Sequence, residues 1–428
     1  MLDETRTLSP ATTAPASQDS AARRRSVWVT RLVVVGIVLA ALNLRPAITS
    51  LGALLEEART GLHMSGSVAG LLTSVPPLCF AVFGVAAPRL ARRFGPGAVL
   101  CAGMAAIAAG LAVRPFAGGT AGFLAASAVA LMGIAVSNVL MPVIVKRYFP
   151  DRVGSMTGLY SMALALGTSV AAAATVPMTA ALGGSWRAGL AVWAALAAAA
   201  ALPWLRLVRD RDRGAGDDSA SGPHDADPAA PAPRITRSPT AWALACFFGL
   251  QATGAYITMG WMPQIFRDAG VSAGAAGVLL AVTMVMGVPL AFVIPRLATR
   301  MKHQGPIAVA LGLCGLTGYV GLLLAPAAGA WAWALLLGIS NCSFPLALTM
   351  IGMRSRTGAG VVRLSAFAQS TGYLISIPGP LLVGVLYQHS GGWGLPIGLM
   401  AGLLVPQIVM GVLAGRDRTI EDETRVRD

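Results

Sequence analysis

Charged residues are scarce in this chain: Asp, Glu, Lys and Arg make up only 12% of the 428 residues, whereas 55% are hydrophobic. A soluble domain carries about a quarter of its residues as charged side chains. The shortage of charge therefore excludes an ordinary soluble fold. Acidic residues are the scarcer sign, with 18 against 32 basic residues, and none lies in the core of a long apolar run.

Signatures of catalysis, metal binding and ATP use are also lacking. No Walker motif (G-x-x-x-x-G-K-[ST]) occurs, so we expect no ATP to bind. The four His residues lie in loops or at the ends of apolar runs, and the five Cys residues lie inside these runs without metal-ligand spacing. We therefore predict no catalytic residues, no metal and no cofactor, and cysteines that are buried without disulfides.

Long apolar runs are what the sequence has in place of these signatures. A helix needs about 20 apolar residues to cross a bilayer, whereas barrel strands alternate over about 10 residues. The runs therefore predict an all-α polytopic membrane protein with twelve transmembrane helices, embedded in a lipid bilayer. They cover 27–55, 66–87, 97–114, 119–145, 153–178, 186–207, 239–265, 272–294, 306–326, 330–352, 363–386 and 393–414.

The basic residues test this topology. The net charge of +14 would suit a nucleic-acid partner, but the basic residues form no cluster with interleaved aromatic residues, so we exclude one. Of the 32 Lys and Arg residues, Arg45 lies within a span, and only Arg59, Arg114, Arg187 and Arg267 fall on one side of the predicted membrane. The other 27 fall on the opposite side. This asymmetry predicts a multi-pass protein of the cell (inner or plasma) membrane with both termini cytoplasmic.

Polar segments divide the chain into two halves. Residues 1–26 are rich in Ser, Thr, Ala and Pro and predict a disordered cytoplasmic tail. Residues 209–238, rich in Asp and Pro, predict a cytoplasmic linker. The linker separates an N-terminal six-helix bundle, 27–208, from a C-terminal one, 239–415, and residues 416–428 form a second cytoplasmic tail.

The two halves also resemble each other in sequence. The segment Pro88–Arg93 matches Pro295–Arg300, and Ser137-Asn138 matches Ser340-Asn341, in each case after corresponding spans. Two six-helix halves around a central cavity are typical of transporters.

One charge lies near the middle of a span. A cation such as Arg45 costs about 2.5–3.5 kcal/mol there, so such residues usually face a cavity. The nearest acidic residues in sequence, Glu56 and Glu57, lie about 16 Å further along the helix. A cavity cation without a counter-ion suggests that the substrate supplies the anion. Alternatively, Arg45 binds carbonyls freed by Pro46, or pairs with a carboxylate from elsewhere.

Polar side chains of other spans are candidates for lining the same cavity. Pro46 removes a backbone hydrogen bond and predicts a kink beside Arg45. Each candidate also has a structural alternative, because polar side chains in spans often bond neighbouring helices or support kinks. The candidate substrate-binding residues besides Arg45 are Thr49 in span one, Asn138 in span four, Gln251 and Tyr256 in span seven, Asn341 in span ten, and Gln369 and Tyr373 in span eleven.

These features resemble a known family. Twelve spans in two halves are similar to the major facilitator superfamily, and Gly84–Arg93 partly matches its loop motif G-x-x-x-D-R-x-G-R-R, with Pro88 in the acidic position. The segments Asn43–Ser50 (NLRPAITS), Ala69–Ser74 and Pro88–Gly95 resemble the cyanate permease and 2-nitroimidazole transporter family. The resemblance implies the import of a small anion such as cyanate, or the movement of nitro-heterocycles.

We therefore predict a secondary transporter that moves a small anionic or polar solute by alternating access and contacts it through Arg45. The lack of core carboxylates leaves exchange, uniport and symport open. One alternative is a drug or metabolite efflux transporter of the same superfamily, which Ala-, Met- and aromatic-rich cavity faces would favour. Another is a membrane receptor or enzyme that moves no solute.

Overall fold

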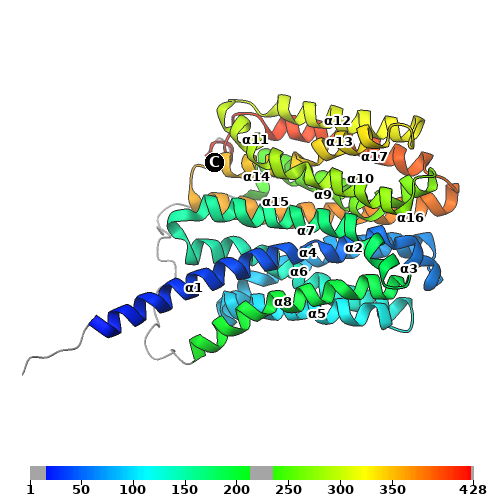
Figure 1. Cartoon of the computed structure of the whole chain (residues 1–428). Coiled ribbons are helices and arrows are strands. Elements are labelled where there is room, and N and C mark those ends of the chain that lie inside the picture. The colour runs from blue at the N-terminus through cyan, green and yellow to red at the C-terminus, as the bar shows by residue number, and fades with distance from the viewer. Residues whose placement is uncertain (1–15, 213–234, 426–428) are drawn as a thin grey trace, which may run out of the picture.

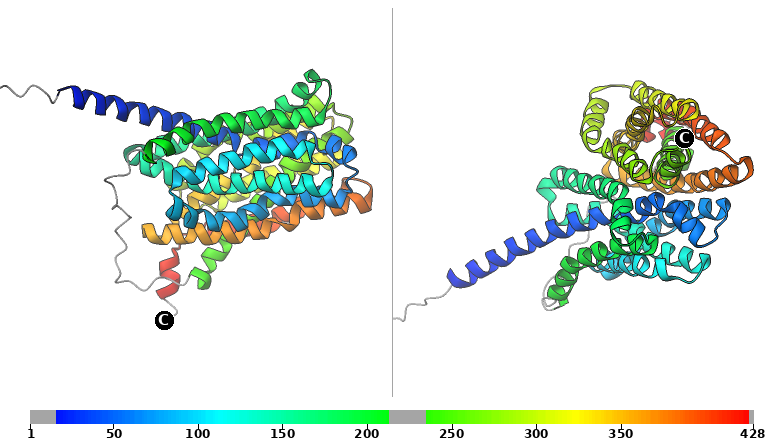
Figure 2. Two further views of the ribbon diagram at one scale, coloured as in Figure 1. Left: turned by 90° about the horizontal axis from the view of Figure 1, so that it is seen from below. Right: turned by 45° about the vertical axis from the view of Figure 1, so that its right-hand side comes forward.

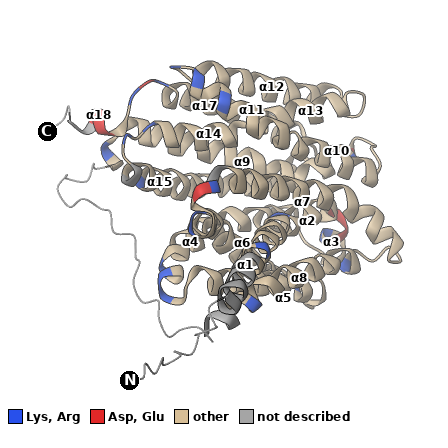
Figure 3. Ribbon diagram, turned by 60° about the vertical axis from the view of Figure 1, so that its left-hand side comes forward, with Lys and Arg blue, Asp and Glu red and all other residues tan. Residues whose placement is uncertain are grey.

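The computed structural model of the chain describes residues 16–212 and 235–425, which are helical almost throughout. Within these residues, twelve helical segments are long and apolar enough to cross a membrane, and each overlaps one of the predicted runs (Figure 1). The prediction of an all-α polytopic membrane protein with twelve transmembrane helices is confirmed. Most of the ribbon carries no charged residue (Figure 3).

Over residues 16–212, the first half has ten helical elements. They are α1 (Ala16–Asn43), α2 (Pro46–Ala53), α3 (Leu55–Gly61), α4 (Gly66–Phe94), α5 (Pro96–Val113), the 3-10 turn η1 (Arg114–Phe116), α6 (Thr120–Tyr148), the 3-10 turn η2 (Pro150–Arg152), α7 (Val153–Ala181) and α8 (Trp186–Asp212).

The second half begins, among the described residues, with a 3-10 turn. Its elements are η3 (Ile235–Arg237), α9 (Pro239–Asp268), α10 (Ala273–Val285), α11 (Gly287–Arg300), α12 (Gly305–Leu324), α13 (Ala330–Asn341), α14 (Ser343–Met353), α15 (Gly358–Ser376), α16 (Pro378–Ser390), α17 (Gly394–Ala414) and α18 (Ile420–Arg425).

The two halves lie side by side, and their spans run in the same general direction (Figure 2). The interface pairs α2 with α9, α4 with α15 and α16, and α7 with α10. The short helices α3 and α18 mark opposite ends of the molecule (Figure 3). We call these the α3 end and the α18 end.

Four of the spans are broken near their middles. The first is interrupted at Leu44 and Arg45, between α1 and α2, and the others break at Met286, Cys342 and Ile377. Pro46 begins α2 and Pro378 begins α16, where the missing N–H of proline removes a bond to the preceding turn. The kink predicted at Pro46 is thus confirmed as a complete break. Broken spans expose backbone groups at mid-membrane, where transporters build their substrate sites.

The predicted boundaries need two adjustments. Helix α1 begins at Ala16, within the tail predicted for residues 1–26, and residues 1–15 lie outside the described residues. Of the predicted linker, α8 and η3 occupy the two edges, and residues 213–234 lie outside the described residues. In the predicted C-terminal tail, α18 docks on the second half: the Glu423 carboxylate accepts hydrogen bonds from the Ser238 hydroxyl (2.5 Å) and the Thr240 hydroxyl (2.6 Å).

Candidate substrate site

The break in the first span places Arg45 at the start of α2. Its backbone leaves the helical conformation (φ −127°, ψ −26°), and its carbonyl accepts hydrogen bonds from the amides of Ile48 (2.9 Å) and Thr49 (3.1 Å). The side chain is half-buried. The same local chemistry that breaks the helix therefore fixes the backbone from which the guanidinium projects.

Aromatic rings from both halves surround this guanidinium. Its Cζ lies 5.9 Å from the centre of the Phe80 ring on α4 and 6.0 Å from that of Tyr256 on α9. Tyr373 on α15 stacks on Phe80 at 4.9 Å, and Phe248 meets Tyr373 edge-on at 5.2 Å. We call these four residues the aromatic cluster. A cation beside ring faces can bind a small, flat ligand that is anionic or electron-rich.

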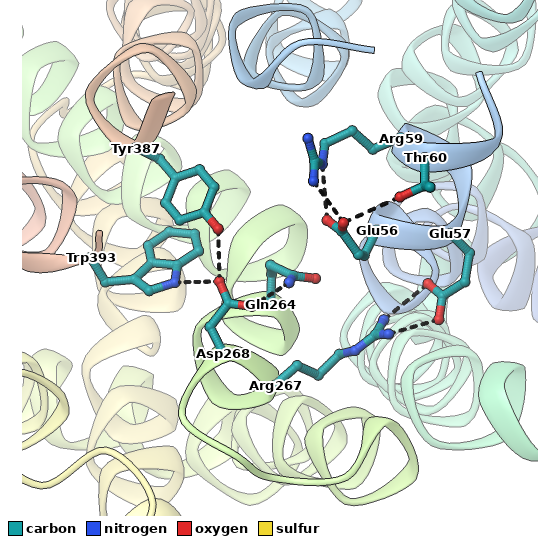
Figure 4. Close-up of polar contacts among 9 residues, drawn as sticks. All are labelled: Glu56, Glu57, Arg59, Thr60, Gln264, Arg267, Asp268, Tyr387 and Trp393. Atoms are coloured by element: carbon teal, nitrogen blue, oxygen red, sulfur yellow. Dashed lines mark hydrogen bonds and ion pairs between the residues drawn. The ribbon is translucent and has the colours of Figure 1, made fainter. Parts of the chain in front are cut away.

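Acidic residues that could have neutralised Arg45 are engaged elsewhere. None of the ion pairs between described residues includes Arg45. Glu56 pairs with Arg59 within α3 (2.7 Å), and Glu57 pairs with Arg267 of α9 (2.9 Å), as Figure 4 shows. The hydrogen bond from Arg59 holds the pKa of Glu56 below its usual value.

Other predicted site residues form hydrogen bonds of their own. The buried Thr49 hydroxyl donates to the Arg45 carbonyl (3.3 Å), within its own helix. Gln251 Nε2 donates to Asn341 Oδ1 (3.4 Å), which brings two predicted residues from different spans together. Gln369 Nε2 donates to the Ser365 hydroxyl (2.7 Å) on α15.

Tyr256 and Tyr373 are the predicted residues that belong to the aromatic cluster. Phe80 and Phe248 of that cluster were missed by sequence reasoning, because a phenylalanine within an apolar run carries no signal of its own. Asn138 is half-buried on α6. The role of each predicted residue toward a substrate stays a prediction.

A second arginine lies inside the bundle, although the sequence placed it at the edge of a loop. Arg114, in η1, is only 2% exposed, and its Nη1 donates to the Ala47 carbonyl on α2 (3.0 Å). It borders a narrow cavity that also reaches Tyr256 and Ser127. The cavity has room for about one water molecule.

The two halves are joined tightly at the α3 end. The Glu57–Arg267 pair crosses between them with two bonds of 2.9 Å, and Figure 4 shows this pair beside the Asp268 carboxylate, which Tyr387 and Trp393 bind. Ser67 donates to Gln388 Oε1 from both its amide and its hydroxyl (2.9 Å each). The site at Arg45 is therefore separated from the α3 end by contacts between the halves.

Comparison with known proteins shows which family the chain resembles. The model of the Major Facilitator Superfamily matches residues 33–360. The chain is 33% identical to a 2-nitroimidazole transporter of Escherichia coli (strain K12) over 91% of this chain and 96% of the relative. It is 29% identical to the cyanate transport protein CynX of the same strain, over 86% of this chain and 94% of the relative.

A solved structure supports the same placement at the level of fold. The crystal structure of a bacterial homologue of the human lysosomal transporter Spinster, in an inward-facing and occupied conformation, is similar with a TM-score of 0.69 and 16% identity. The match covers 92% of this chain and 96% of that one. Together with the twelve spans, these matches show a multi-pass membrane transporter of the secondary kind. The chain belongs to the Major Facilitator Superfamily, and its resemblance to the cyanate and 2-nitroimidazole transporters is confirmed.

Proposed function

We propose that the chain carries a small, flat or rod-shaped solute with negative oxygen or nitrogen atoms, and that Arg45 contacts this solute during alternating access. The observation that supports the proposal is a half-buried guanidinium without an acidic partner among the described residues, 5.9 and 6.0 Å from two aromatic rings. Such a cation needs a negative partner, and the solute is the group able to supply one.

Cyanate and a 2-nitroimidazole share chemistry that suits this arrangement. Both are small, both have delocalised π electrons, and both present negative charge on terminal atoms. The guanidinium fork can bind those atoms while the rings of the aromatic cluster cover the π faces. The relatives that carry these names support this solute class for the present chain.

The orientation in the membrane follows as part of the proposal. Basic residues lie in the last turns of several spans, at the α18 end of the molecule. They include Arg92 and Arg93 of α4, Lys146 and Arg147 of α6, and Arg300 of α11. By the positive-inside rule the α18 end faces the cytoplasm. The tightly joined α3 end then faces outward.

The test is counterflow of labelled cyanate in liposomes that contain the purified protein. Arg45→Ala should reduce counterflow by about 10- to 100-fold, the effect of losing hydrogen bonds to a charged group. Arg45→Lys keeps the charge but not the fork and should fall in between. Arg31→Ala is the matched control, because Arg31 belongs to the same first span, on α1, and its side chain is exposed. Full counterflow by a well-folded Arg45→Ala protein would refute the proposal.

The aromatic cluster favours a second candidate, the efflux of neutral drug-like compounds. Four rings that contact one another can bind an uncharged aromatic solute without the arginine. Accumulation in inverted against right-side-out vesicles gives the direction of flux. Transport of neutral aromatics that survives Arg45→Ala but is lost in Tyr373→Ala would favour this candidate.

A further inference from the structure

The second buried arginine has hydrogen-bond donors that the described protein atoms do not satisfy. Arg114 uses Nη1 to bind the Ala47 carbonyl and places its Cζ 5.6 Å from the Phe123 ring centre. Within residues 16–212 and 235–425, its Nε and Nη2 find no hydrogen-bond partner, and neither does the Ser127 hydroxyl, which is 1% exposed. Both residues border the narrow cavity described above.

Such an arrangement is costly without a ligand. A buried cation needs a neutralising partner, and each buried donor left unpaired carries a further penalty. None of the ion pairs between described residues includes Arg114. A water molecule would pair a donor but would leave the charge uncompensated, whereas an anion does both.

The walls of the cavity restrict the kind of anion. Ile48 and Leu51 of α2, Leu72 of α4 and Leu131 of α6 provide an apolar surface. The small volume excludes carboxylates with a side chain and phosphate esters. A strongly hydrated ion would lose its water shell against these walls without replacement. The cavity has room for about one water molecule, so it fits a single-atom, weakly hydrated monovalent anion of halide size and not an ion of several atoms.

We propose that Arg114 and Ser127 bind such an anion in a site of its own, between α2, α4, α6 and η1, apart from the solute position at Arg45. Tyr256 borders both positions, from the cavity on one side and from Arg45 on the other. The proposal does not rest on which solute the protein transports.

The test uses bromide as the probe and Arg45→Gln as the background, so that any bromide held by Arg45 is removed. Melting temperature is measured in sodium bromide against sodium gluconate at equal ionic strength. Bromide should raise the melting temperature of Arg45→Gln in a saturable way. Adding Arg114→Gln should abolish this rise. Adding Arg187→Gln should preserve it, because Arg187 is an exposed cation of the same end whose Nε binds the Pro115 carbonyl outside the cavity.

Two further measurements keep the result decisive if Arg114→Gln does not fold. Ser127→Ala removes one donor and should weaken bromide binding by about tenfold. Crystals of the wild-type protein with bromide should show an anomalous peak beside Arg114. An unchanged bromide response in Arg114→Gln or Ser127→Ala, or a cavity that holds water alone in bromide, overturns the proposal. Loss of transport in Arg45→Ala is a separate outcome, so either proposal can fail alone.

Discussion

The α3 end and the α18 end use polar residues for different purposes. At the α3 end, hydrogen bonds and an ion pair cross between the halves, from Glu57 to Arg267 and from Ser67 to Gln388. At the α18 end, the buried Arg354 donates to the Ala414 carbonyl and to Gln304, all within the second half. One end therefore ties two bodies together, whereas the other keeps one body rigid. In the alternating access proposed above, each half moves as a rigid body, so the contacts that cross between the halves at the α3 end have to break and re-form.

Backbone contact shows the same difference. A Cβ built at Gly52 would lie 2.0 Å from the Met259 carbonyl oxygen in the other half, and one at Gly70 would lie 2.9 Å from the Leu381 carbonyl oxygen. Gly277 similarly faces the Ala172 carbonyl oxygen at 2.5 Å. These glycines let the helices of the two halves approach between the middle of the bundle and the α3 end.

The largest effect should come from Gly52→Ala. Its methyl group cannot fit against Met259, and overpacking of about 1–3 kcal/mol shifts a two-state equilibrium about 5- to 150-fold. The α3 end should open, and counterflow should fall accordingly. Spin-label distances between α3 and α10 measure the opening. Gly402→Ala, where a Cβ meets nothing within 4 Å, is the control. An unchanged distance in Gly52→Ala would contradict the role assigned to this contact.

The next effect, of another kind, is expected from Arg354→Ala. This change leaves the Gln304 and Ala414 acceptors unpaired, and it should destabilise the second half by about 1–3 kcal/mol. Melting temperature in detergent should drop, while the spin-label distance at the α3 end stays constant. Arg356→Ala is the neighbouring control, because its ion pair with Asp422 is exposed. Opening of the α3 end in Arg354→Ala would remove the distinction between the two ends.

The smallest effect should come from Glu57→Gln. The Glu57 and Arg267 side chains are 32% and 21% exposed, so their pair contributes about 1 kcal/mol or less. The closed population at the α3 end should fall by about fivefold or less, and high salt should mask the difference. Exchanging the charges with Glu57→Arg and Arg267→Glu should restore it. Glu56→Gln, which breaks a pair inside α3, serves as control, and an equal shift there would argue against a role for the crossing pair.

Much of the fold was predictable because the lipid bilayer restricts the length and composition of a helix that crosses it. Each span has to be long and apolar, so the twelve runs located the helices, and the rarity of a charge within a span singled out Arg45. Proline chemistry predicted the break at Pro46. The start of α1 at Ala16 was not predicted, because the first turns of this helix are polar and lie outside the apolar run that located the span.

The site could be predicted only in part, because its remaining members meet through tertiary packing. The Phe80 ring stacks on the Tyr373 ring, although the two residues are 293 positions apart in the sequence. No local sequence pattern predicts a contact over this separation. Arg114 is the last residue of the third apolar run, 97–114, and therefore looked like a residue at the edge of a loop. Arg114 is buried because η1 packs against α5, α6 and α8. The sequence around Arg114 does not predict this packing.

The docking of α18 bears on the order in which the chain matures. Ser238 caps α9, the first span of the second half, and Glu423 binds both Ser238 and Thr240. Glu423 belongs to α18, which follows the last span, α17, in the sequence. The start of the first span in this half can therefore gain this acidic partner only after every span of the half has been synthesised.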